Sequence, residues 1–462
     1  MQGCRWPRTR RTADPPLNPS PDDQPNWWRR HLHRIQAFIA RTYYQVRVAG
    51  AEVPVEGPVL LVANHPNSLM DPPLLAMAAG RPVRFLAGAH LFRRRSIAWA
   101  VRGSGAIPVY RRSEEPGEME KNRASFGAVR DALLANSVVG VFPEGFTHSE
   151  PSLVPLKTGA ARIALLTAEA RGKAFPILPV GITFQGGKER FRSRALVLVG
   201  KPVRWGDLAA NPRDPAHARE LTQRIEGALG RVTVNLRDWE DLPLVEAAEA
   251  VHEAEFGRRQ SRNPVRWLAR MRRTAQALEQ ARERDDPRLA ELDQGIEAHI
   301  RVLGSLGLTP KDLHLRPRSS VAVRWTLGNL FFFGLALPLA LVGTLVFWLP
   351  WTLVQRAEPR FRLTPDRRAT YRVLGSAVTC GVWVMLLAAL VMELRGWRPA
   401  LVLLLLLPLT GFLTLRIRSR WRTAVADLRR FLVLRGRRDV RTRLLEAQRG
   451  LALSIRELQN RI

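Results

Sequence analysis

The chain has 462 residues, a formal net charge of +31 and only two cysteines, Cys4 and Cys380. This length fits one large domain with an appended region, or two ordinary domains. One cysteine lies in a polar N-terminal stretch and the other inside an apolar run, which argues against a disulfide between them. No cysteine–histidine spacing typical of zinc occurs either, so we expect no metal site.

Nearly all of the positive charge is arginine, because only six of the 72 basic residues are lysines. A strongly basic protein attracts anions, either nucleic acid or an anionic membrane surface. The arginines are spread along the chain, and no recognition motif interleaves them with aromatic residues. Long apolar runs in the C-terminal third favour anionic membrane lipids as partners, and we expect no nucleic acid partner.

The N-terminal stretch changes character near residue 26. Residues 1–25 are rich in Pro, Arg, Asp and Asn and predict a disordered tail. Their arginines are not followed by an apolar segment, so they predict no secretory signal, and the active part is expected in the cytoplasm. Residues 26–48 place apolar side chains at helical spacing with arginines between them. This helix either lies in the membrane interface or packs on its own domain.

An α/β pattern predicts one folded domain over residues 49–213. Short apolar strands alternate with helices expected at 72–79, 119–136 and 157–171. The expected strands are 59–63, 83–86, 138–142, 177–182 and 195–199, with a further short one ahead of Arg111. This alternation is typical of a largely parallel sheet covered by helices on both faces. Functional residues should then lie in the loops that leave the strand ends.

The rest of the chain predicts helices and membrane segments. Residues 214–320 read as a helical region of mixed charge, and residues 421–462 as a basic amphipathic C-terminal helix. Between them, residues 321–420 hold the membrane segments. Their apolar runs, at 326–354, 373–392 and 399–415, approach or exceed the length that crosses a bilayer.

The topology of these runs is constrained by charge. Arginines crowd residues 356–372, which a single crossing by the first run would place outside, against the positive-inside tendency. A re-entrant hairpin bent near Gly334–Pro338 would keep that loop inside, and the last two runs would then form a hairpin. A simple three-span layout is the alternative.

The first chemical signal is His65 at the end of a predicted strand, followed six residues later by Asp71. A carboxylate can accept one ring N–H, fix the tautomer and raise the basicity of the imidazole. The other ring nitrogen can then take a proton from an attacking hydroxyl. Alone the pair is weak support, because histidine–aspartate pairs at such spacing are more often structural.

Three further sequence segments follow the His65 loop in a characteristic order. Gly103–Arg112 ends in two arginines after a short strand, Phe142–Ser149 contains Phe-Pro-Glu-Gly, and Ile177–Val180 is a proline-containing strand. With the Asn64–Asp71 block they resemble the four motif blocks of the glycerol-3-phosphate and lysophosphatidate acyltransferase family. Pro155–Ala160 is similar to the lysine–glycine stretch of that family. The resemblance covers roughly residues 40–205.

The resemblance implies a role for each matching residue. His65 would be the general base on a glycerol hydroxyl, and Asp71 would orient it. Arg111, with Arg112, would bind the acceptor phosphate through paired guanidinium hydrogen bonds. Glu144 and Gly145 would shape the acceptor site, and Lys157 would assist with phosphate. The co-substrate would be acyl-CoA or acyl carrier protein, with no other cofactor and no covalent acyl-enzyme.

Two departures from the family pattern stand out. Five residues separate His65 from Asp71 where the family usually has four, and His148 and its neighbours lack the arginine often seen after the glutamate. The sequence Asn-His-Pro-Asn-Ser-Leu-x-Asp-Pro resembles a branch with C-terminal membrane segments. Two other functions stay open at this point: an acyltransferase for another lysophospholipid or lipid alcohol, and a non-enzymatic basic membrane scaffold.

Overall fold

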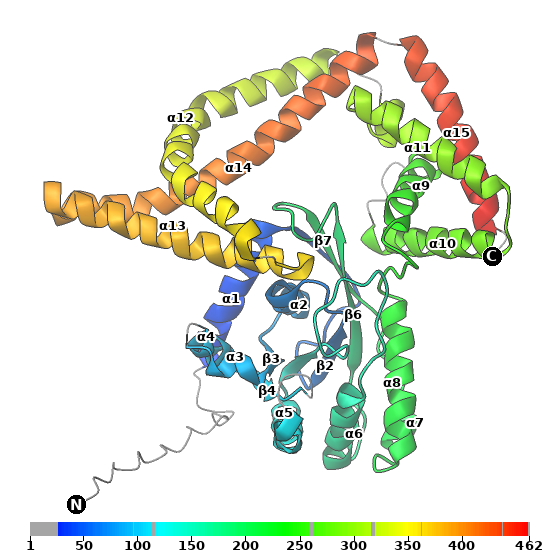
Figure 1. The fold of residues 1–462 in the computed structure, drawn as a ribbon, viewed down its shortest axis with the longest axis vertical. Coiled ribbons are helices and arrows are strands. Elements are labelled where there is room, and N and C mark those ends of the chain that lie inside the picture. The colour runs from blue at the N-terminus through cyan, green and yellow to red at the C-terminus, as the bar shows by residue number, and fades with distance from the viewer. Residues whose placement is uncertain are drawn as a thin grey trace, which may run out of the picture.

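The computed structural model describes residues 26–95, 97–111, 116–257, 263–315, 319–361, 363–436 and 438–460. The predicted disordered tail at residues 1–25 and the candidate phosphate ligand Arg112 lie outside the described residues. The described chain forms an α/β domain, a group of helices beside it and three long apolar helices (Figure 1).

A seven-stranded sheet forms the centre of the α/β domain. The strands are β1 (Gln45–Gly50), β2 (Val59–Ala63), β3 (Val83–Gly88), β4 (Ile107–Val109), β5 (Val138–Val141), β6 (Ile177–Gln185) and β7 (Arg194–Val199). They are ordered β1-β7-β6-β2-β5-β3-β4, and every pair is parallel except β6 and β7. The carboxyl ends of β2, β5, β3 and β4 therefore meet at one edge, which is where the sequence places its chemistry.

Helices cover both faces of this sheet. The helices of the α/β domain are α1 (Asn26–Tyr43), α2 (Asp71–Ala79), α3 (Ala89–Arg93), α4 (Ala98–Gly103), α5 (Asn122–Leu134), α6 (Gly159–Arg171), α7 (Gly206–Ala209) and α8 (Pro215–Gly230). Alternate residues of β2 enter different cores: Leu60 and Val62 pack with α5, α6 and α8, whereas Leu61 packs with α1 and α2. Burial on both faces explains why this strand is a continuous apolar run. The predicted fold class is confirmed.

Two expected boundaries differ from those of the structure. The helix predicted over 26–48 ends at Tyr43, and residues 45–48 belong to β1, which pairs in parallel with β7. Alternating Val46 and Val48 suit a strand better than a helix, because branched side chains pack well on a pleated surface. The first helix of the region expected from residue 214, α8, belongs instead to the α/β domain. Its residues Leu221 and Ile225 lie in the core beneath the sheet.

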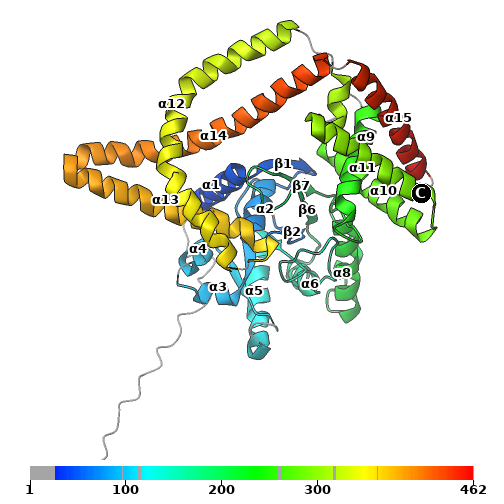
Figure 2. The ribbon, with the colours of Figure 1, turned by 45° about the horizontal axis from the view of Figure 1, so that its top comes forward.

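A second group of helices lies beside the sheet. It consists of α9 (Asp241–Phe256), α10 (Pro264–Glu283), α11 (Arg288–Leu306) and α15 (Arg438–Asn460). Ala452 and Ile455 of α15 are buried against α9 and α11, so the C-terminal helix returns to the helical region after the membrane segments (Figure 2). The amphipathic helix predicted for 421–462 is divided between the end of α14 (Trp397–Gly436) and α15.

Three helices are long and apolar enough to cross a membrane. They are α12 (Ser319–Ala357), α13 (Pro365–Arg395) and α14, with candidate spans at Ala336–Phe361, Arg367–Arg395 and Trp397–Gly436. α12 bends along its length but remains helical through Gly334–Pro338 (Figure 1). The structure thus has one bent helix where we expected a hairpin of two arms. Whether this segment re-enters the membrane stays a prediction. Four short 3₁₀ turns complete the described chain: η1 (Ser68–Met70), η2 (Pro116–Lys121), η3 (Pro310–His314) and η4 (Glu358–Phe361).

Small residues allow α12 and α14 to approach each other closely. A Cβ added at Gly343 would come within 2.2 Å of the Thr414 hydroxyl and 2.7 Å of the Thr410 carbonyl oxygen, whereas one at Gly334 meets nothing within 4 Å. Thr414 also donates a hydrogen bond to the Ala340 carbonyl across this contact. Small residues and such hydrogen bonds are typical of helix pairs in membranes.

We therefore expect Gly343→Leu to separate α12 from α14 and to destabilise the purified protein, by about 1–3 kcal/mol for an overpacked site. Gly334→Leu on the same helix is the matched control and should behave as wild type. The measurement is the thermal unfolding midpoint in detergent. Equal midpoints for the two variants would contradict this packing.

Candidate active site

Asn64 anchors the start of the loop that carries the candidate base. It follows β2, and its side chain makes two hydrogen bonds to Ile182 on the neighbouring strand β6. The Asn64 amide donates to the Ile182 carbonyl at 3.0 Å, and the Ile182 N–H donates to Asn64 Oδ1 at 2.7 Å. The side chain thus continues the ladder between the strands where the backbone of β2 leaves it, which fixes the direction in which His65 departs.

His65 and Asp71 form the pair that the sequence predicts. His65 Nδ1 lies 2.8 Å from Asp71 Oδ2, and Asp71 is fully buried as the first residue of α2. The same oxygen accepts the backbone N–H of Asn67 at 2.7 Å. The loop between the two residues contains η1, where Ser68 has a φ of +48°. The structure thus brings the carboxylate within hydrogen-bonding distance of a ring nitrogen of His65.

Opposing effects act on the pKa of the Asp71 carboxyl group. Burial raises the pKa of its carboxyl group, while hydrogen bonds from His65 and Asn67 and the charge of Lys188 lower it. The N-terminus of α2 adds a favourable field for an ionised side chain. An ionised Asp71 can only accept a hydrogen bond from Nδ1 of His65, so in that state Nδ1 carries the proton and Nε2 holds a lone pair.

The imidazole of His65 is held in its plane by Phe142. The two rings stack with centroids 4.0 Å apart and planes 13° from parallel. Within the described residues Nε2 has no hydrogen-bond partner, and the side chain is 13% exposed. The hydrogen bond to Asp71 and the stacking on Phe142 together fix the orientation of the His65 ring, with Nε2 toward the surface.

Glu144 joins the His65 loop to the loop that follows β5. Its side chain is fully buried, and Oε2 accepts the backbone N–H of His65 at 2.7 Å. Oε1 lies 2.8 Å from Nε2 of His148, although the angle is poor for a hydrogen bond. His148 Nδ1 accepts the Glu150 N–H, so the His148 proton sits on Nε2 and faces the carboxylate. Glu144 therefore contacts the backbone of the candidate base itself.

Gly145 and Lys157 are brought together beside Glu144. Gly145 has a φ of +81°, and a Cβ there would lie 2.8–2.9 Å from the Cδ, Cε and Nζ atoms of Lys157. The Lys157 N–H donates to the Pro143 carbonyl at 2.8 Å. The lysine stem thus crosses directly over the glycine, and a side chain at position 145 would displace it.

Arg111 lies farther from this group. It follows β4, which is separated from β2 by β3 and β5. With about 4.8 Å between neighbouring strands, β4 lies about 14 Å from β2 along the same edge of the sheet. The free hydroxyl and the phosphate of a glycerol phosphate are only a few bonds apart, so such a ligand contacts both residues only if the Arg111 side chain reaches back along that edge toward His65.

Lys188 belongs to the site although the sequence motifs do not include it. It lies in the turn between β6 and β7, where its ammonium donates to the Pro66 carbonyl at 2.6 Å and to Ser149 Oγ at 2.9 Å. One charge therefore joins the His65 loop to the Glu144 loop. The signal available in the sequence was a Gly-Gly-Lys turn directly after a buried strand, but its partners are more than 30 residues away.

The same turn is supported from two sides. The Tyr44 hydroxyl donates to the Lys188 carbonyl at 2.6 Å, and Asn67 donates to that hydroxyl at 2.6 Å. From α13, Arg372 donates to the Glu189 carbonyl at 2.8 Å while its guanidinium pairs with both carboxylate oxygens of Glu358. α13 also packs against η1. The first turns of a candidate membrane helix therefore support the loop between His65 and Asp71.

The comparisons with known proteins concern this same part of the chain. Residues 45–183 match the family model described as Acyltransferase. This part of the chain is an acyltransferase-family domain. The candidate residues His65, Asp71, Arg111, Glu144, Gly145 and Lys157 lie inside the matched range, whereas Lys188 lies just beyond it.

Two relatives of the acyltransferase domain come from Saccharomyces cerevisiae. Glycerol-3-phosphate O-acyltransferase 2 is 30% identical over 194 residues, which are 40% of this chain and 25% of the relative. Glycerol-3-phosphate O-acyltransferase 1 is 28% identical over 270 residues, which are 56% of this chain and 34% of the relative. The chain thus matches at most about a third of the length of these relatives.

One solved structure is also similar. The crystal structure of the 1-acyl-sn-glycerophosphate (LPA) acyltransferase PlsC from Thermotoga maritima is 20% identical, covers 43% of this chain and 78% of its own, and has a TM-score of 0.32.

Lys188→Gln removes a positive charge that lowers the pKa of the buried Asp71 carboxyl. Without it the His65–Asp71 pair holds a proton more tightly, so the basic form is lost at a higher pH. We expect the acidic limb of kcat/KM against pH to move to higher pH in Lys188→Gln. Lys188→Arg keeps the charge and should leave the limb near that of wild type. Loss of activity in Lys188→Gln without movement of the limb would contradict an electrostatic role.

Proposed function

We propose that this protein is a membrane-bound O-acyltransferase of phospholipid biosynthesis. It transfers a fatty acyl group from acyl-CoA or acyl carrier protein to a hydroxyl of glycerol 3-phosphate or 1-acylglycerol 3-phosphate. The observation that carries the proposal is the 2.8 Å contact between His65 Nδ1 and the buried Asp71 carboxylate inside an acyltransferase-family domain. The names of the two yeast relatives support glycerol 3-phosphate as the acceptor.

In the proposed mechanism His65 acts as a general base. Nε2 takes the proton of the acceptor hydroxyl as its oxygen attacks the thioester carbonyl carbon. Asp71 keeps the proton on Nδ1 and stabilises the imidazolium that forms. The tetrahedral intermediate collapses by breaking the carbon–sulfur bond, the thiolate leaves, and the proton on Nε2 passes to it. The ester and the free thiol are the products, and the dyad returns to its starting state.

The remaining site residues are assigned to acceptor binding. Arg111 would bind the phosphate by two parallel hydrogen bonds, and Lys157, beside Gly145, would add a second charge. Arg112 stays a candidate for the same role. Glu144, with Gly145, would shape the acceptor site by holding the His65 backbone rather than by contacting the phosphate.

The protein is proposed to be integral to the cytoplasmic membrane with its catalytic domain on the cytoplasmic face. The turn between α13 and α14 lies far from the sheet, whereas the first residues of α13 lie against it (Figure 1). The arginine-rich residues 356–372 and 416–422 flank the ends near the domain. This distribution supports a hairpin of α13 and α14 with its basic ends inside.

An acceptor panel tests the proposal. The purified full-length protein in nanodiscs is supplied with radiolabelled palmitoyl-CoA, or the same acyl group on carrier protein, and with glycerol 3-phosphate, lysophosphatidate, lysophosphatidylcholine or a long-chain alcohol. We expect turnover with one of the first two acceptors. Turnover only with the last two would show that the acceptor is another lysophospholipid or a lipid alcohol. No turnover with any of the four would favour a non-enzymatic membrane scaffold.

His65→Ala should lower that turnover by roughly 10²–10⁴-fold, the usual contribution of a general base. His217→Ala, on α8 and bonded only to the backbone and to its own helix cap, is the matched control and should retain activity. Each variant is compared at equal folded concentration by size-exclusion chromatography. Full activity in His65→Ala would refute the proposed base.

A further inference from the structure

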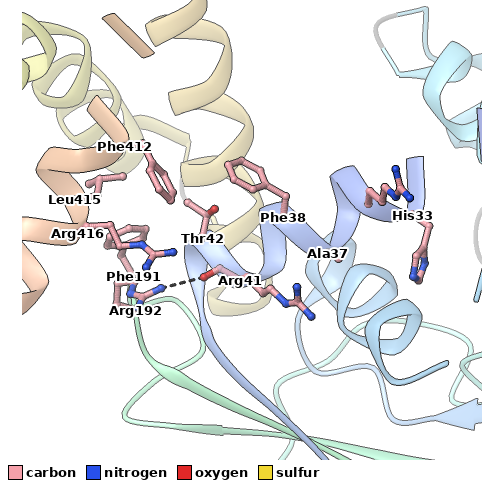
Figure 3. A pocket seen from close by; sticks show the side chains of 11 residues that line it. His33, Ala37, Phe38, Arg41, Thr42, Phe191, Arg192, Phe412, Leu415 and Arg416 are labelled. Carbon is pink, nitrogen blue, oxygen red and sulfur yellow. Dashed lines mark hydrogen bonds between the residues drawn. The ribbon is translucent and has the colours of Figure 1, made fainter. Parts of the chain in front are cut away.

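A cavity of about 400 Å³ lies between α1, the β6–β7 turn and α14 (Figure 3). None of the catalytic or phosphate-binding residues assigned above lines it. It is therefore a second binding space, built where the N-terminal helix, the α/β domain and the third candidate membrane helix meet.

One wall of the cavity is apolar and belongs partly to α14. Phe38 of α1 and Phe412 of α14 face each other with ring centroids 5.9 Å apart, and Leu415 lies on the same wall. Leu415 is the last residue of the apolar run that begins at 399, and Arg416 opens a stretch in which arginine recurs. Such a change from apolar to basic marks the level at which a membrane helix passes from acyl chains to head groups.

The cavity is cationic directly beside this apolar wall. The guanidinium groups of Arg192 and Arg416 lie side by side there (Figure 3). Burial, and then the charge of Arg416, lower the pKa of Arg192. Across the residues that the structure describes, neither arginine has a carboxylate partner; Arg192 bonds a backbone carbonyl and Arg416 stacks on Phe412. Two neighbouring like charges without a counter-ion favour an anion between them.

Arg192 is held in place by its backbone. Its φ of +64° is unusual for a residue with a side chain, and its N–H donates to the Tyr43 carbonyl at 2.6 Å. One guanidinium nitrogen donates to the Arg41 carbonyl at 2.9 Å. Strained conformations of this kind persist where the surroundings fix them and are concentrated at binding sites.

We propose that this cavity binds an anionic phospholipid, with the phosphate between Arg192 and Arg416 and the first carbons of its chains against Phe38, Phe412 and Leu415. Paired guanidinium groups match phosphate oxygens, and the apolar wall continues from the membrane-facing run of α14. A free phosphate ion would use only the cationic end, so the lipid accounts for both walls. The proposal is independent of the proposed enzymatic activity.

Binding of the lipid would join three elements. Arg416 lies on α14, Arg192 on the β6–β7 turn, and Phe38 on α1. Phe191, the next residue in the turn, packs edge-on against Tyr43 with ring centroids 5.5 Å apart. The lipid would thus lie at the contact between the α/β domain and α14.

Equilibrium binding of fluorescent phosphatidylglycerol to the delipidated full-length protein in neutral detergent tests the proposal. We expect saturable binding, with fluorescent phosphatidylcholine binding at least about tenfold more weakly because it offers no net negative charge. Arg192→Gln combined with Arg416→Gln should weaken phosphatidylglycerol binding by about tenfold or more, since each charged hydrogen bond is of that order. Arg418→Gln combined with Arg422→Gln removes the same charge from α14 outside the cavity and should leave binding unchanged.

Competition distinguishes the source of the phosphate. Unlabelled dihexanoyl phosphatidylglycerol should displace the probe, and inorganic phosphate at the same concentration should not. The Arg416 guanidinium stacks on the Phe412 ring, so the single substitution Arg416→Gln should leave the fold intact. It should still weaken binding, which separates loss of the site from misfolding. Equal loss in the two double variants, equal affinity for phosphatidylcholine, or displacement by inorganic phosphate as effective as by the lipid would overturn the proposal.

Discussion

The hydrogen bond between His65 and the buried carboxylate of Asp71 is the interaction on which the rest of the site depends. It fixes the proton on Nδ1 and leaves Nε2 basic, but it requires a charged oxygen to be kept away from water. Isolated burial would neutralise such a group. Burial raises the pKa of Asp71, and the hydrogen bond from His65, the Asn67 N–H and the charge of Lys188 act in the opposite direction and favour the ionised form. Much of the surrounding structure can be understood as support for this one ionised side chain.

That support comes from segments that are distant in sequence. Loops after β2, β5 and β6 meet at the carboxyl edge of the sheet, where Glu144 holds the His65 backbone and Lys188 bridges two of the loops. The turn that carries Lys188 is in turn held by Tyr44 from the N-terminal side and by Arg372 from α13. The His65 loop and the candidate membrane helix α13 are therefore parts of one hydrogen-bonded network.

The sequence predicted the elements whose signals are local. A continuous apolar run indicated β2, and motif order indicated that His65, Asp71 and Glu144 belong together. What the sequence did not reveal depends on long-range contacts. Nothing near Lys188 indicates that its ammonium reaches Pro66, and the spacing alone does not predict the 3₁₀ turn between His65 and Asp71. Residues 45–48 continued a helical pattern and were assigned wrongly, because only pairing with β7 makes them a strand.

The most direct test of the account is a double-mutant cycle between His65 and Asp71, measured as kcat/KM on the acceptor that the wild-type protein uses. If Asp71 acts only by orienting His65, Asp71→Asn should lower activity strongly in the wild-type background and by less than about twofold in His65→Ala, because residues that act as a unit are not additive. An equal loss in both backgrounds would mean that Asp71 works independently of His65, and would contradict the pair as the catalytic unit.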